Sequence, residues 1–184
     1  MGARFTHRLA RDDDRPALAA LMRLAIDRLQ AGVLTPAQIA ASHEIMGIDR
    51  QLIADRTYFC LFAGPQLVGC GGWSARRTLF GGDHSLAQRA PERLDPATEP
   101  ARIRAMYTHP DHARRGVGSR ILALSEAAAR GAGFEAAELM ATRAGEPFYA
   151  AAGYRVIERT AHRGANGALV PLVRMGKRLE RAPA

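Results

Sequence analysis

The residues best suited to carry chemistry lie in HPDHARRGVGSRIL, positions 109–122, where two arginines and two glycines precede an alanine-rich apolar run. If that run is a helix, its first N–H groups lack partners and its macrodipole favours an anion there. Glycines carry no side chain to hold a phosphate away from the backbone, and Arg114 and Arg115 add positive charge. The same glycines could instead allow a tight strand-to-helix connection. The loop is therefore either a phosphate-binding site or a purely structural turn.

The spacing argues against two familiar phosphate loops. The chain contains no GxxxxGK(S/T) sequence, which a Walker loop requires. It also lacks a GxGxxG followed by a ribose-binding acid, so a Rossmann loop is poorly supported. The functional interpretation is therefore a pyrophosphate cradle of another kind.

A βαβ-like unit must position this loop. The sequence predicts a strand at 101–108, a helix at 116–132 and a second strand at 136–142. A connection through a helix favours parallel pairing of these two strands, whereas the rest of the chain predicts hairpins. The other expected elements are strands at 4–9, 58–63, 67–77, 154–161 and 168–178, and helices from Asp12–Asp14 to Gln30 and at 36–46, 49–56 and 146–153.

These elements predict a mixed α/β fold, with a mostly antiparallel sheet of about six to seven strands flanked by helices. The order does not fit a doubly wound dinucleotide fold. With 184 residues, 47% of them hydrophobic, the chain fits one domain, residues 1–184, with a sizeable core. Residues 78–100 are rich in proline, glycine and mixed charge, and are expected to form a long loop that is functional or mobile.

Composition restricts the partners. The net charge of +8 comes almost entirely from arginine, since Lys177 is the only lysine, and the arginines are dispersed. No RNA-binding or zinc-finger pattern occurs, so no nucleic-acid partner is expected, although a basic nucleic-acid-binding protein stays an alternative. Cys60 and Cys70 are expected to be buried thiols of a reducing compartment. His109 and His112 lack a third ligand, so no metal is expected. The sequence has no signal peptide and no apolar run of membrane-spanning length, so we expect no membrane contact and a cytoplasmic location.

Two stretches together resemble a known family. HPDHARRGVGSRIL and, about thirty residues later, EPFYAAAGYRVIE resemble the GNAT superfamily of N-acetyltransferases over roughly residues 101–160. Tyr149, Gly153 and Tyr154 match the family sequence Tyr-x-x-x-Gly-(Phe/Tyr) in full. The expected order of elements extends the resemblance over nearly the whole chain.

Two positions depart from the family pattern. Gly116 and Gly118 match the loop sequence (Q/R)-x-x-G-x-(G/A), but its first position is Ala113. A neighbouring arginine would supply the polar side chain that alanine does not offer there. Thr142 stands at a strand end where members often carry asparagine, and its hydroxyl can still donate a hydrogen bond.

The resemblance implies that acetyl-CoA is the co-substrate and that its pantetheine arm lies between splayed strands at 101–108 and 136–142. It also implies direct transfer to an amine of a small molecule or peptide in a ternary complex, without a covalent enzyme intermediate. The residues expected to bind acetyl-CoA are Met106, Tyr107, Thr108, Arg114, Arg115, Gly116, Val117, Gly118, Ser119 and Thr142.

Attack of a neutral amine on the thioester requires stabilisation of an oxyanion and a proton for the departing thiolate. The resemblance assigns the first task to the backbone amide of Thr108 and the second to Tyr149 as general acid. The ring of Tyr149 could instead be packed in the core. The candidates for a general base are Glu44, Asp83, His84 and Tyr107, with His84 slightly preferred.

The acceptor is expected between residues 17–46, residues 72–100 and the C-terminal hairpin. An aromatic ring and an acid could receive a cationic amine, while arginines would favour an acceptor carrying a carboxylate or phosphate. The candidates for these contacts are Trp73, Arg76, Arg77 and Asp83. A non-catalytic CoA-binding regulatory module is a second alternative, and a homodimer through the terminal strands or helices is a further expectation.

Overall fold

The computed structural model describes residues 5–180, which form a seven-stranded sheet in the order β1-β2-β3-β4-β5-β7-β6. Only β4 and β5 pair in parallel, so the expected mixed, mostly antiparallel sheet is confirmed. Arg4 of the expected first strand, and both ends of the expected 1–184 domain, lie outside the described residues. The strands are β1 Phe5–Leu9, β2 Tyr58–Ala63, β3 Gln66–Ser74, β4 Ala101–Thr108, β5 Ala136–Thr142, β6 Arg155–Arg163 and β7 Leu169–Arg178.

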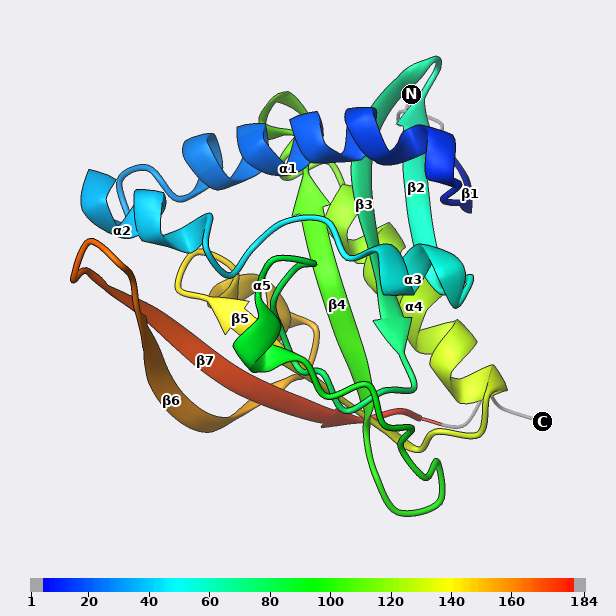
Figure 1. The fold of residues 1–184 in the computed structure, drawn as a ribbon. Helices are drawn as coiled ribbons and strands as arrows, with labels where there is room; N and C mark the ends of the chain where they lie inside the picture. Colours follow the sequence, from blue (N-terminus) through cyan, green and yellow to red (C-terminus); the bar gives the residue numbers. More distant parts are fainter. Residues whose placement is uncertain (1–4, 181–184) are drawn as a thin grey trace.

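Helices cover both faces of the sheet. Figure 1 shows α1 and α3 in front of the strands and α4 behind them. The helices are α1 Arg15–Leu29, α2 Pro36–Ser42, α3 Arg50–Ala54, α4 Val117–Gly131 and α5 Glu146–Ala151, with 3-10 turns at Asp12–Asp14, Leu86–Gln88 and Pro110–His112. Within residues 5–180, no helix is both long and apolar enough to cross a membrane.

The alternation of side chains along β2 explains the two layers of core. Tyr58 and Cys60 pack with residues of α1 and α3, whereas Leu61 joins Val117 and Ile121 on the α4 side. Successive strand residues point to opposite faces, so one apolar strand serves both layers. Strand β2 therefore contacts the helices on both faces of the sheet.

Two expected elements end three or more residues early in the structure. The helix expected at 36–46 ends at Ser42, whose hydroxyl donates to the Gln38 carbonyl at 2.9 Å. The strand expected at 67–77 ends at Ser74, whose hydroxyl accepts from Arg76 N at 3.1 Å. Arg76 then bridges to Arg93 and pairs with Asp55 at 2.6 Å. In both cases side-chain hydrogen bonds compete with continuation of the regular element.

Strands β4 and β5 diverge. Their pairing is limited to Ala101 opposite Ala137 and Arg102 opposite Glu138. Further along β4, Ala105 has a φ of +50°, and the pairing with β3 shifts register there, as in a β-bulge. The bulge is held by the Tyr58 hydroxyl, which donates to the Ala105 carbonyl at 2.6 Å. The splayed strand pair is therefore confirmed.

The segment expected as a long loop, residues 78–100, is tied to the rest of the fold. Thr78 exchanges hydrogen bonds with Ala90, and Leu94 is buried in the core. A buried ion pair also anchors it: Arg104 bonds Asp49 at 2.8 Å and donates to the carbonyls of Thr78 and Gly81. Residues 79–81 are thereby fixed beside β4.

Candidate active site

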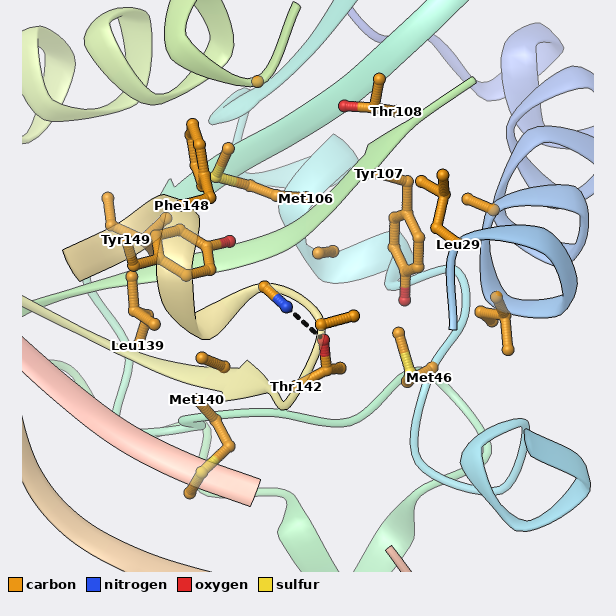
Figure 2. Close-up of a pocket in the computed structure, with 18 of the residues that line it drawn as sticks. Leu29, Met46, Met106, Tyr107, Thr108, Leu139, Met140, Thr142, Phe148 and Tyr149 are labelled. Atoms are coloured by element: carbon orange, nitrogen blue, oxygen red, sulfur yellow. Dashed lines mark hydrogen bonds between the residues drawn. The ribbon is translucent and has the colours of Figure 1, made fainter. Parts of the chain in front are cut away.

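A cavity of about 820 Å³ opens where β4 and β5 diverge. Its walls come from the end of α1, residues 45–47 and 79–81, β4, the start of α4, β5 and α5 (Figure 2). Most residues expected to bind acetyl-CoA line it: Met106, Tyr107, Thr108, Arg114, Gly116, Val117, Gly118, Ser119 and Thr142. Tyr149 lines it too, whereas Arg115 and His84 do not.

The loop before α4 has the geometry of an anion cradle. Gly116 is the N-cap with a φ of +84°, and no side chain caps the helix. The first hydrogen bond into the helix runs from Arg120 N to Gly116 O, so the N–H groups of residues 117–119 have no intrahelical acceptor. Arg114 is exposed and forms no ion pair with the described residues. These donors fit a phosphate.

The two glycines of this loop have different structural reasons. Gly116 needs its positive φ, and a Cβ there would meet open space. A Cβ on Gly118 would lie 3.3 Å from Cζ of Phe148, because α4 and α5 approach closely at this point. Gly118 therefore sets the contact between the cradle and the helix that carries Tyr149.

Tyr149 presents its hydroxyl to the cavity (Figure 2). Its ring forms edge-to-face contacts with Phe148 and Tyr154, at centroid distances of 5.0 and 5.9 Å. The hydroxyl forms no hydrogen bond with the described residues, and burial raises the pKa of Tyr149 well above its ordinary value. A phenol in this state is protonated at neutral pH and is free to donate.

The turn between β5 and α5 holds Tyr149 in place. Gly145 N donates to the Thr142 hydroxyl at 3.1 Å, the bond drawn in Figure 2, and Pro147 follows in the first turn of α5. Because that hydroxyl oxygen accepts this bond, its own proton stays available to a ligand.

The far end of β4 supplies a backbone donor. His109 N donates to Val68 O at 2.8 Å, and Thr108 stands opposite Gly69. Hydrogen-bonded and non-hydrogen-bonded pairs alternate along an antiparallel ladder, so the Thr108 N–H points away from β3. The Thr108 N–H therefore points to the side of β4 on which β5 has separated from it.

The sequence model of the acetyltransferase (GNAT) domain matches residues 54–156, which include the bulged strand, the cradle and Tyr149. The chain belongs to the GNAT acetyltransferase family. A comparison with curated protein sequences gave no match.

Solved structures of family members share the fold. A GCN5-related N-acetyltransferase from Rhodopseudomonas palustris superposes with a TM-score of 0.70 at 19% identity, over 97% of this chain and 98% of that one. PaiA N-acetyltransferase from Thermoplasma acidophilum, in complex with coenzyme A, gives 0.62 at 14% identity over 95% and 99%. YncA from Salmonella typhimurium, with its cofactor acetyl-CoA, gives 0.61 at 18% identity over 98% and 96%. At these identities the likeness establishes the GNAT fold.

The expected general bases of this GNAT protein are largely engaged elsewhere. His84 donates from Nε2 to the His43 carbonyl at 2.8 Å, Asp83 pairs with Arg50, and Glu44 accepts from Ala165 N. None of these three candidates lines the cavity. Tyr107 does, but burial raises its pKa well above the ordinary value, so its phenol stays protonated.

The residues expected to recognise the acceptor also lie outside the cavity lining. Trp73 is buried against Phe134, and Arg76 pairs with Asp55. Arg77 pairs with Glu99, and Asp83 with Arg50. These side chains stabilise the 74–100 region.

Residues that sequence reasoning did not single out form the other end of the cavity. Leu29 and Met46 stand across the cavity from Tyr149 in Figure 2, and Gln30 and Phe80 also contribute. They come from α1, the segment after α2 and the 79–81 segment, which are far apart in the sequence. Their segments fall within residues 17–46 and 72–100, where the acceptor is expected, but the side chains themselves have no signal beyond the apolar face of α1 running to its last turn.

Proposed function

We propose that this GNAT acetyltransferase transfers the acetyl group of acetyl-CoA to a primary amine by direct attack in a ternary complex. The observation that carries the proposal is one continuous cavity joining the amides at the start of α4 to the hydroxyl of Tyr149. The CoA-bound structures of PaiA and YncA, which share the fold, support acetyl-CoA as the donor.

Donor binding follows from charges and exposed amides. The N–H groups of residues 117–119 and the exposed Arg114 and Arg115 would hold the pyrophosphate. Met106 and Thr108, on the part of β4 that has no parallel partner, would bond the pantetheine arm through their backbone. Thr142 lies on the opposite wall with its hydroxyl proton available.

The chemical step needs two donors. The Thr108 N–H would stabilise the negative charge that develops on the thioester oxygen, as in an oxyanion hole. When the C–N bond forms and the C–S bond breaks, Tyr149 would give its proton to the sulfur. The raised pKa of Tyr149 supports this role, since the phenol is protonated when the thiolate departs.

The test measures release of the CoA thiol with a thiol reagent, and the acetylated product by mass spectrometry, with acetyl-CoA and a panel of amines. Wild type is expected to acetylate at least one amine. Tyr149→Phe should lower kcat by about 10²- to 10⁴-fold, the usual contribution of a general acid. Its acetyl-CoA Kd should stay within about twofold, because the deleted hydroxyl makes no hydrogen bond with residues 5–180.

Two results would contradict the proposal. Acetyl-CoA binding without turnover of any amine would indicate the non-catalytic CoA-binding module instead. Unchanged kcat in Tyr149→Phe would remove Tyr149 from the chemistry and leave it as a packed side chain.

A further inference from the structure

The cavity has an apolar end opposite Tyr149. Six side chains from four segments build it: Ile26, Leu29, Ile45, Met46, Phe80 and Leu172. Among the described residues that line the whole cavity there is no aspartate, glutamate, histidine or lysine. A molecule bound at this end therefore meets hydrocarbon and sulfur, with few polar groups.

The charged groups in the lining do not alter that conclusion. Arg104 has its charge paired by Asp49 and donates to the carbonyls of Thr78 and Gly81. Arg114 lies at the start of α4, at the other end of the cavity. An ammonium group entering the apolar end would lose its hydration without gaining a carboxylate, and that desolvation is strongly unfavourable.

Two polar groups at this end have unused hydrogen-bonding capacity. Gln30 is 3% exposed, and its Oε1 has no hydrogen-bond partner, while its Nε2 lies 3.6 Å from Sδ of Met46, a weak acceptor. The hydroxyl of Tyr107 accepts from Gly47 N at 3.0 Å, but its own proton has no acceptor among the described residues. Because Met46 and Gly47 are adjacent, the amide of Gln30 and the hydroxyl of Tyr107 both contact the segment 46–47.

A buried, unpartnered amide oxygen calls for an explanation, and a ligand N–H supplies one. Met46 is unbranched and only partly buried, so its side chain can move to open Gln30 to the cavity. From this arrangement we infer that the acceptor is an apolar amine that binds uncharged, an arylamine being the simplest case, and that Gln30 accepts a hydrogen bond from it. This inference rests on the proposed acetyl transfer and names its substrate class.

An uncharged acceptor also suits a cavity that contains no base. The nitrogen lone pair attacks the thioester carbon, the C–N bond forms, and the C–S bond breaks with the proton of Tyr149 passing to sulfur. The nitrogen then loses one proton to water, and water returns a proton to Tyr149. No protein carboxylate or imidazole takes part.

The experiment compares aniline, benzylamine and spermidine as acceptors at saturating acetyl-CoA. At neutral pH, kcat/KM for aniline should exceed that for spermidine at least tenfold. For benzylamine, kcat/KM should rise tenfold per pH unit up to the pKa of the amine, while for aniline it should be level over the same range. Preference for spermidine, or a level profile for benzylamine, would overturn the inference while leaving acetyl transfer established.

A matched pair of variants tests Gln30. Gln30→Met keeps the length of the side chain, and should raise the KM for aniline about tenfold with the KM for acetyl-CoA unchanged. Its thermal midpoint should stay level or rise, because an unsatisfied amide is removed. Gln30→Glu places a carboxylate at the same point and should shift preference toward benzylamine and spermidine. A lower thermal midpoint in Gln30→Met with an unchanged KM for aniline would show that Gln30 is purely structural. Turnover of none of the amines would overturn both the apolar acceptor and the proposed acetyl transfer.

Discussion

The buried pair of Asp49 and Arg104 should be the ion pair that contributes most to holding residues 79–81, which line the cavity, beside β4. Their side chains are 1% and 2% exposed, and their atoms approach to 2.8 Å. Burial lowers the pKa of Arg104, opposed by the carboxylate of Asp49. Asp49→Asn leaves the buried guanidinium without its counter-charge, although the carbonyls of Thr78 and Gly81 still accept from it. Removing one partner of a buried pair costs about 3–5 kcal/mol, so we expect a loss of about 3 kcal/mol.

Equilibrium urea unfolding measures this loss as a lower midpoint with an unchanged slope. The control is Asp83→Asn, whose side chain is 23% exposed and whose partners Arg50 and Arg89 are 61% and 25% exposed, so its loss should stay below about 1 kcal/mol. Asp49→Leu combined with Arg104→Met removes both charges of the pair and should recover part of the stability. It does not restore the contact of Asp49 with Arg89 or its cap on the Gln51 N–H at the start of α3. A loss of less than about 1 kcal/mol in the free energy of unfolding of Asp49→Asn would show that the buried pair contributes no more than a surface ion pair.

Three further predictions concern the β-bulge in β4, the two buried cysteines and the proposed general acid Tyr149. Ala105→Gly should raise the free energy of unfolding by about 0.5 to 1 kcal/mol in the same urea assay, because φ is +50° at this residue. Burial raises the pKa of both Cys60 and Cys70 to about 12, so a thiol reagent should modify them only on unfolding; rapid labelling of the native protein would contradict this. Because the pKa of Tyr149 is raised, kcat/KM at saturating amine should not decline as pH passes about 10, where an ordinary tyrosine ionises.

The order of elements could be predicted because its signals are local. Apolar spacing, turn residues and the glycines before α4 identify the strands and helices, apart from element ends such as Ser42 and Ser74. The cradle and Tyr149 follow from two motifs, and they line one cavity because α5 packs against the start of α4 through Phe148.

The regions around the acceptor end could be predicted, since residues 17–46, residues 72–100 and the C-terminal hairpin all contribute to it. Its individual side chains could not, because their positions depend on contacts between distant residues. Asp49 and Arg104 are 55 positions apart, and each looks like an ordinary surface charge in the sequence. Ala105 adopts a positive φ that alanine does not signal. Trp73 and Arg76 suggested a binding site by type, but Phe134 and Asp55, their actual partners, lie far along the chain.

The most direct test of the account is the thermal midpoint of wild type, Ser119→Glu and Ser119→Gln, with and without acetyl-CoA. Ser119 is exposed in the first turn of α4, so glutamate there should stabilise the free protein by about 0.3 to 1 kcal/mol while repelling a phosphate. At roughly a hundred times its Kd, acetyl-CoA should stabilise wild type and Ser119→Gln by about 2.7 kcal/mol, and Ser119→Glu far less. Equal stabilisation of all three proteins, or none of wild type, would contradict acetyl-CoA binding at the amides of the first turn of α4.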